Sequence, residues 1–263
     1  MSNILEKIVK DKKESLDLIK KDKTLNIIEK NIREQKFFNF KEAIQKNKGV
    51  SLISEIKKAS PSAGILVSNY NHLEIAKTYI ENGATCLSVL TEEKYFLGKL
   101  EHIHDIKKKF NIPILAKDFF IDPYQIALSK SYGCDCILII IAALNERQAD
   151  EIYAEALKHN LSVIVEVHDL KEAEIALKYD QAIIGVNNRN LKTLEVSIEN
   201  TISIFKVLKN HSGPLISESG IKDENDAKYI FDKTGIKNFL IGESLLKSDK
   251  PGDLMKKLIQ ITQ

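Results

Sequence analysis

The stretch DCILIIIAALNERQADEIYAEALKHNLSVIVEV, residues 135–167, contains the pattern that decides the fold. Its two ends, 135–141 and 161–167, are apolar at nearly every position, as expected of parallel strands covered on both faces. The segment 145–160 between them has apolar residues three and four apart, which is the spacing of an amphipathic helix. A strand, a helix and a second strand in this order predict a parallel βαβ unit.

The same rhythm recurs along the chain. Segments such as 71–83 and 171–180 again have helical spacing, and Gly83 and Asn160 stand where helices would end in left-handed geometry. Short apolar runs begin at residues 51, 86, 113, 135, 161, 182, 214 and 237. Eight βα units predict an α/β fold, a single (β/α)8 TIM barrel. A doubly wound open sheet has the same alternation, although no G-x-G-x-x-G motif follows the first run.

About 48 residues precede the first predicted strand. We expect an N-terminal helical extension at 1–48 and a catalytic barrel at 49–263, together forming one structural domain. Residues 4–20 have the pattern of a Lys-rich amphipathic helix, and residues 39–45 that of a second, short helix. The extension either plugs the bottom or side of the barrel or lies over its mouth as a lid. Composition does not separate these two alternatives.

Composition argues against several classes of partner. The 263 residues include 39 Lys and Arg and 37 Asp and Glu, a net charge of +2 that does not indicate a nucleic-acid surface. No apolar run has the length of a membrane span, and the first residues lack the apolar core of a signal peptide. Cys86, Cys134 and Cys136 have neither paired nor metal-ligand spacing. We therefore expect a cytoplasmic protein with buried, inert thiols and neither nucleic-acid nor membrane partners.

Polar side chains, most of them ionisable, gather at the predicted strand ends, which is where TIM barrels carry their catalytic groups. They are Glu55, Lys57, Lys117, Asp118, Glu166, His168, Asn187, Arg189, Glu218 and Glu243. Charges crowded into one concave site need each other or a ligand as partners. The pattern predicts general acid–base chemistry, with Lys117 made a better proton donor by a neighbouring cation. The alternative for Lys117 is a structural ion pair with Asp118 or Glu166.

The last two predicted strands end in glycine and serine. ISESGI (216–221) and LIGESL (240–245) place Gly220 and Gly242 where loops begin and helices follow. TIM barrels often hold a phosphate between these two loops, so we expect a phosphorylated small-molecule substrate. Ordinary turn glycines are the alternative. The six histidines do not form a metal-ligand pattern, and packing or capping is the expected role of His168.

Seven ordered motifs together carry a resemblance to a known family. They are SEIKKASPSAG (54–64), SVLTEEKYFLG (88–98), ILAKDFFID (114–122), VEVHD (165–169), IGVNNRNL (184–191), SESGI (217–221) and LIGESLL (240–246). In this order and at these intervals the chain resembles indole-3-glycerol phosphate synthase of tryptophan biosynthesis over nearly its whole length. The resemblance implies ring closure of 1-(o-carboxyphenylamino)-1-deoxyribulose 5-phosphate, with release of carbon dioxide and water and without a metal or organic cofactor. We expect a monomer.

The resemblance also implies residue roles. Lys117 resembles the general acid that protonates the ribulose carbonyl. Glu55 and Glu166 resemble the carboxylates that handle later proton transfers, and Lys57 lies near the substrate's carboxylate and phosphate with a second acid role open to it. The implied substrate-binding residues are Ser60, Pro61, Phe119, Asn187, Arg189 and Glu218. The implied phosphate-binding residues are Ser219, Gly220, Gly242 and Glu243, the last through its backbone N–H.

Two other functions stay open on the residues alone. A lysine at a barrel strand end can condense with a carbonyl, so Lys117 could serve a phosphosugar aldolase as a Schiff-base lysine. A barrel that keeps the phosphate site without turnover would be a binding protein.

Overall fold

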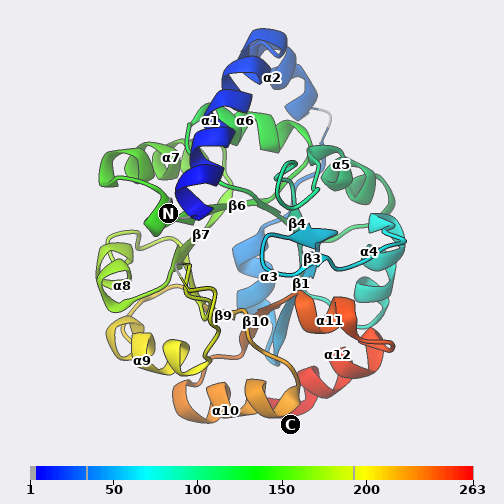
Figure 1. The fold of residues 1–263 in the computed structure, drawn as a ribbon, viewed down its shortest axis with the longest axis vertical. Helices are drawn as coiled ribbons and strands as arrows, with labels where there is room; N and C mark the ends of the chain where they lie inside the picture. The colour runs from blue at the N-terminus through cyan, green and yellow to red at the C-terminus, as the bar shows by residue number, and fades with distance from the viewer. Residues whose placement is uncertain (1–3, 34, 192, 263) are drawn as a thin grey trace.

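In the part of the chain that the structure describes, eight parallel strands close into a barrel (Figure 1). This computed structural model describes residues 4–33, 35–191 and 193–262. The strands are β1 (Ser51–Ile56), β4 (Cys86–Leu90), β5 (Ile114–Lys117), β6 (Cys136–Ile140), β7 (Ser162–Val167), β8 (Ile183–Asn187), β9 (Leu215–Glu218) and β10 (Asn238–Ile241). Each coincides with one predicted apolar run. The predicted TIM barrel is confirmed, and the open sheet is excluded.

The ring closes where the first barrel strand meets the last. β1 pairs in parallel with β10 through Ser51 and Asn238, and with β4 through Ile53 and Cys86. β1, β4 and β6 are buried at every residue, because side chains fill the barrel and helices cover its outside.

Helices follow the strands and form an outer ring (Figure 1). They are α4 (His72–Glu81), α5 (Leu100–Lys109), α6 (Tyr124–Ser131), α7 (Glu146–Lys158), α8 (Leu170–Ala176), α9 (Glu199–Leu208), α10 (Glu224–Thr234), α11 (Glu243–Lys247) and α12 (Pro251–Ile259). Asn145 begins α7 with a capping box completed by Gln148. Gly83 and Asn160 have φ values of 91° and 54°, so both take the predicted left-handed geometry.

The N-terminal extension reaches both ends of the barrel. It forms α1 (Ile4–Asp22), α2 (Leu25–Arg33) and α3 (Phe40–Lys46). α3 lies at the bottom, where the N–H of Lys41 donates to Ser162 Oγ at 3.1 Å, at the start of β7. α1 lies at the mouth, where Ile8 lines the central pocket. The position at the bottom of the barrel is therefore correct for α3, and the position over the mouth is correct for α1.

Two features of the fold were not predicted. Ile28 of α2 packs against Ala127 and Leu128 of α6, which attaches α2 to the barrel. The loop after β1 contains a small antiparallel hairpin, β2 (Ala59–Ser60) with β3 (Gly64–Ile65).

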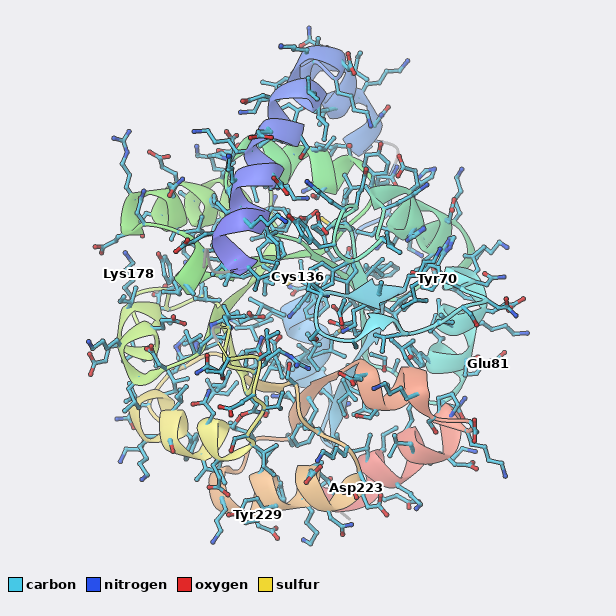
Figure 2. The ribbon with its side chains drawn as sticks, viewed as in Figure 1. Tyr70, Glu81, Cys136, Lys178, Asp223 and Tyr229 are labelled. Carbon is cyan, nitrogen blue, oxygen red and sulfur yellow. The ribbon has the colours of Figure 1, made fainter. Side chains whose placement is uncertain are left out.

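The core and the outer surface differ as expected of a globular protein. The three cysteines are free and buried, and Cys136 lies in the interior, whereas Lys178, in the turn after α8, and Tyr229 of α10 lie at the periphery (Figure 2). Burial raises the pKa of all three thiols, which makes them unreactive. None of the described helices is apolar over a length that could span a membrane.

Candidate active site

One pocket opens at the carboxyl ends of the barrel strands. All fourteen residues predicted as catalytic, substrate-binding or phosphate-binding line it. They are Glu55, Lys57, Ser60, Pro61, Lys117, Phe119, Glu166, Asn187, Arg189, Glu218, Ser219, Gly220, Gly242 and Glu243. The structure thus brings together side chains from β1, β5, β7, β8 and β9, because the carboxyl ends of all barrel strands meet at one rim.

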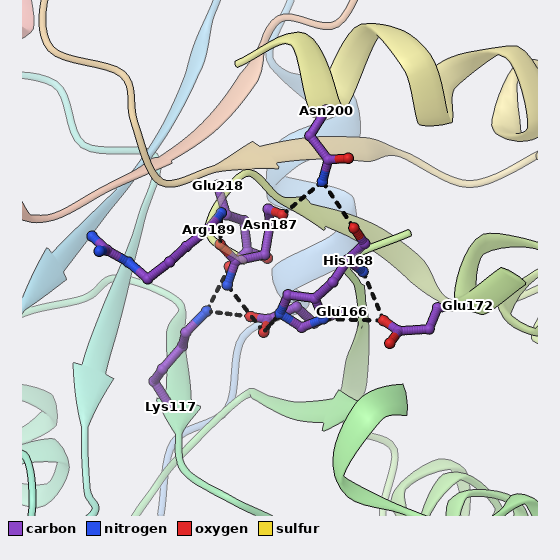
Figure 3. Close-up of polar contacts among 8 residues, drawn as sticks. All are labelled: Lys117, Glu166, His168, Glu172, Asn187, Arg189, Asn200 and Glu218. Atoms are coloured by element: carbon purple, nitrogen blue, oxygen red, sulfur yellow. Dashed lines mark hydrogen bonds and ion pairs between the residues drawn. The ribbon is translucent and has the colours of Figure 1, made fainter. Parts of the chain in front are cut away.

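The ammonium of Lys117 points toward the carboxylates of Glu166 and Glu218 (Figure 3). Its Nζ is 2.9 Å from Glu166 Oε2 and 2.5 Å from Glu218 Oε2. Burial lowers the pKa of an ammonium, but the surrounding carboxylates outweigh burial here and raise the pKa of Lys117. Lys117 is therefore a permanent cation in the ligand-free protein.

This environment corrects the expectation for Lys117. We expected a neighbouring cation to make it a better donor, but two carboxylates adjoin it and have the opposite effect on its pKa. The ion pair with Glu166 is present. Asp118 instead pairs with Lys12 of α1 at 2.6 Å and accepts a hydrogen bond from Thr91 at 2.8 Å.

The two carboxylates that share Lys117 have different surroundings. Glu166 Oε1 also accepts a hydrogen bond from Asn187 at 3.2 Å and lies 3.1 Å from His168 Nε2. Burial opposes the ionisation of Glu166, but Lys117 and His168 outweigh it and hold its pKa well below the ordinary value. Glu218 Oε1 is buried and has no hydrogen-bond partner in the described part of the chain. Burial raises the pKa of Glu218 to about 7 in spite of Lys117.

Two glycines make room for the carboxylates. A Cβ added to Gly185 would overlap Glu218 Oε1, and one added to Gly242 would overlap Glu55 Oε1. Gly242 was predicted as a phosphate-binding residue. The structure shows a separate reason for glycine at this position, because a larger residue would overlap Glu55. Glu55 itself forms an ion pair with Lys57, which lies on the same side of the chain two residues later.

The loops after β9 and β10 have the features of an anion site. Ser219 and Gly220 follow β9 with φ values of 65° and 81°, so the chain turns through two consecutive left-handed residues. Gly242 precedes α11, whose first backbone N–H groups lack intrahelical partners. The Glu243 side chain pairs with Arg189 at 3.4 Å and with Lys247 at 2.6 Å.

The pocket also has an apolar wall. The rings of Phe96 and Phe119 lie 6.2 Å apart between centroids, and both line the pocket. Ile4, Leu5 and Ile8 of α1 line it as well. The wall suits a flat aromatic ring, while the charged side suits carboxylate, hydroxyl and phosphate groups.

The family model described as indole-3-glycerol phosphate synthase matches residues 5–258. The chain belongs to the indole-3-glycerol phosphate synthase family. A synthase of this name from Legionella pneumophila strain Paris is 40% identical over 259 residues, covering 98% of this chain and 99% of the relative. One from Acinetobacter baumannii strain SDF is 42% identical over 252 residues, covering 95% and 93%. The chain is thus a carboxy-lyase of tryptophan biosynthesis.

Solved structures of other enzymes share the fold of this synthase family member. Tryptophan synthase subunit alpha from Legionella pneumophila matches with a TM-score of 0.61 at 15% identity, over 88% of this chain and 97% of that one. 3-Hexulose-6-phosphate synthase from Salmonella typhimurium matches with a TM-score of 0.64 at 15% identity, over 80% and 97%. At this identity the likeness concerns the fold alone.

Sequence reasoning missed several residues around this synthase pocket. His168 was expected to pack or cap, yet it contacts Glu166 and Glu172. A signal for it was present, because Asp169 and Glu172 have the spacing of a helix N-terminus directly after the strand. Gly185 lies in the middle of an apolar run, where nothing in the sequence indicates the carboxylate above it. Among the described residues, no group of three His, Cys, Asp or Glu side chains is arranged to hold a metal ion.

Proposed function

We propose that this pocket closes the indole ring by general acid–base catalysis, with Lys117 as the first proton donor. The observation that carries the proposal is the placement of the Lys117 ammonium between Glu166 and Glu218, at 2.9 and 2.5 Å, inside the pocket. A fixed cation and two carboxylates with different pKa values supply both an acid and a base at one pH.

In the first step the ring carbon that bears the carboxylate attacks the ribulose carbonyl carbon. The carbonyl oxygen becomes an alkoxide, which is a far stronger base than the carboxylates that hold Lys117. Lys117 gives its proton to this oxygen, although its own pKa is raised. Positive charge builds up on the anilino nitrogen, and the carboxylates of Glu55 and Glu166 stabilise it.

In the second step carbon dioxide leaves. The electron pair of the broken carbon–carbon bond returns to the ring, which becomes aromatic again and neutralises the nitrogen. The new hydroxyl group then leaves as water. Lys57 supplies the second proton, and Glu166 or Glu55 takes one proton from the adjacent carbon. Two protons are given and one is taken, so the reaction consumes one proton as the carboxylate becomes carbon dioxide.

The remaining side chains hold the substrate in place. Backbone N–H groups after Ser219 and Gly242 bind the phosphate, and Phe119 packs on the anthranilate ring. Arg189 binds the carboxylate. Glu218, whose Oε1 lacks a partner in the described part of the chain, binds a substrate hydroxyl. Pre-positioning of this kind accelerates a reaction within one molecule because the reacting atoms are already near each other.

The aldolase alternative fits this environment poorly. A Schiff base begins with attack by a neutral amine, whereas the carboxylates around Lys117 favour the ammonium. Borohydride treatment with a ketose phosphate tests this directly. Permanent attachment of the sugar to Lys117 would support the aldolase and contradict our assignment.

The decisive experiment is to supply 1-(o-carboxyphenylamino)-1-deoxyribulose 5-phosphate and follow the fluorescence of the indole product. We expect turnover with a chelator present and no metal added. Absence of product from a folded protein would overturn the proposed function, and a requirement for added metal would overturn a mechanism based on these side chains alone.

A further inference from the structure

The imidazole of His168 lies beside the buried carboxylate of Glu166 (Figure 3). His168 follows β7, and its side chain is 8% exposed. Its Nε2 lies 3.1 Å from Glu166 Oε1, in an ion pair that does not have hydrogen-bond geometry. Its Nδ1 lies 3.0 Å from Glu172 Oε2. His168 is not one of the described residues that line the pocket, whereas Glu166 is. An effect of His168 on the substrate would therefore be exerted through Glu166.

The two carboxylates determine the charge of this ring. A neutral imidazole has one N–H and one bare nitrogen, and the bare nitrogen would face a carboxylate oxygen and repel it. Protonation of both nitrogens removes that repulsion. Burial lowers the pKa of a histidine, but Glu166 and Glu172 outweigh burial and raise the pKa of His168 to about 10.

The scaffold fixes the imidazole from two further directions. Glu172 Oε2 also accepts the backbone N–H of His168 at 2.7 Å, while Asp169 caps the first turn of α8. Asn200 of α9 donates to the backbone carbonyls of His168 and Asn187, both at 3.0 Å. His168 and Asn187 both make a polar contact with Glu166 Oε1. The side-chain amide of Asn200 therefore links the backbones of His168 and Asn187, both of which contact Glu166.

We propose that His168 is a positioning residue, which Glu172 keeps protonated, and which holds Glu166 ionised and correctly oriented to act as the base of the reaction. The inference rests on the proposed role of Glu166. It explains why two carboxylates that share Lys117 differ. Glu166 has a second cation, whereas Glu218 has none in the described part of the chain, which agrees with the lowered pKa of Glu166 and the raised pKa of the buried Glu218.

The groups that face this pair define what a pH experiment reports. They are Glu166 of β7, Glu172 of α8 and, beyond Glu166, Lys117 of β5 and Glu218 of β9. His168→Gln removes the cation but keeps a polar side chain of similar length. Glu172→Gln leaves the imidazole in place and removes one of the two carboxylates that protonate it.

For His168→Gln we expect kcat to fall roughly 10- to 100-fold, with KM nearly unchanged, because a mispositioned base slows proton transfer more than binding. The acidic limb of the kcat–pH profile should move to higher pH, because Glu166 loses a neighbouring cation. In Glu172→Gln the pKa of His168 falls, so activity should decline with rising pH earlier than in the wild type. A Glu166→Gln background should remove most of the His168→Gln effect.

His72→Gln is the matched control. His72 Nε2 lies 3.1 Å from Asp105, the same length as the His168–Glu166 contact, but between α4 and α5 and away from the pocket. We expect its pH profile and kcat to equal those of the wild type. Thermal unfolding of each variant checks that it is folded.

Nitrogen-15 NMR of the unmodified protein tests the inference without a mutation. We expect both ring nitrogens of His168 to stay protonated at pH 8. A neutral ring at pH 7, or a His168→Gln enzyme whose pH profile does not move, would overturn the inference. Failure of the wild type to form product would instead refute the proposed function, and the NMR result would still decide the charge of His168.

Discussion

Lys117, the proposed proton donor, is paired with two carboxylates in the structure. In the proposed mechanism it protonates the developing alkoxide. We predict that Lys117→Met lowers kcat by roughly 10²- to 10⁴-fold, the range for one general acid, and changes phosphate-dependent binding little. Fluorescence of the indole product and titration with a product analogue measure the two effects.

Lys77→Met on the outside of α4 serves as its control, because Lys77 is 63% exposed and pairs loosely with Glu81 at 3.8 Å. A Lys117→Met enzyme that retains wild-type turnover would remove Lys117 from the mechanism. The removal also leaves Glu166 and Glu218 facing each other, so one of them should take up a proton.

The pKa of Glu218, which burial raises to about 7, predicts a pH dependence of stability. A carboxyl whose pKa is higher in the folded state binds more protons there than in the unfolded chain. Its contribution to the free energy of unfolding is therefore greatest below the ordinary carboxyl range and falls as pH rises toward 7. We expect Glu218→Gln to remove a slope of at most about 1.4 kcal/mol per pH unit, the value for one proton.

Urea unfolding of wild type and Glu218→Gln between pH 4.5 and 7.5 measures this difference. Glu166 has the opposite sign, because its lowered pKa makes stability rise with pH at the acidic end. Parallel stability curves for wild type and variant across this range would contradict the raised pKa of Glu218.

At the scale of elements, helix α1 is fastened over the mouth by charge as well as by apolar contact. Lys12 and Asp118 form an ion pair at 2.6 Å with side chains only 13% and 10% exposed. We predict that Lys12→Met loosens α1 and costs about 1 kcal/mol of substrate binding, roughly fivefold in KM, with a smaller change in kcat. Steady-state kinetics and hydrogen exchange of the α1 amides test the prediction.

Lys20→Met is the comparison within the same helix. Lys20 pairs with Asp122 at the same 2.6 Å, but its side chain is 36% exposed, and Asp122, unlike Asp118, does not line the pocket. We expect that variant to leave KM unchanged. Equal KM values for Lys12→Met and wild type would mean that α1 covers the mouth without contributing to binding.

At the scale of the whole molecule, a buried carboxylate of the barrel, Asp135, holds both an ion pair within the barrel and a hydrogen bond to the N-terminal extension. Asp135 Oδ2 lies 2.7 Å from Lys107, and Asp135 Oδ1 accepts the backbone N–H of Phe38, which precedes α3. The side chains of Asp135 and Lys107 are 0% and 4% exposed. Lys107→Met leaves a buried carboxylate without its cation, so we predict a loss of about 3–5 kcal/mol in the free energy of unfolding.

Denaturant unfolding of Lys107→Met against Lys77→Met measures that loss. The Lys77–Glu81 pair is more than half exposed, and its removal should change stability by less than about 1 kcal/mol. Equal effects of the two substitutions would mean that solvent reaches Asp135 in the folded protein.

The sequence was informative about the whole molecule because buried parallel strands are apolar almost throughout, as in Cys136–Ile140. It located the pocket because a barrel brings all strand ends to one rim. Helix α2 escaped prediction because Leu25 and Ile27 are more than half exposed, and Ile28 alone is deeply buried among residues 25–32. The surroundings of Lys117 were predicted only in part. The pair with Glu166 was among the alternatives, whereas the pair with Glu218 of β9 was missed, because the two residues are far apart in sequence.

The pairing of β1 with β10 has a consequence for the growing polypeptide. The ribosome makes Ser51 long before Asn238, its partner. Until then one edge of the nascent sheet stays open, and exposed strand edges invite association with other chains. The order in which the chain is made therefore leaves this edge of β1 unpaired until β10 has been synthesised.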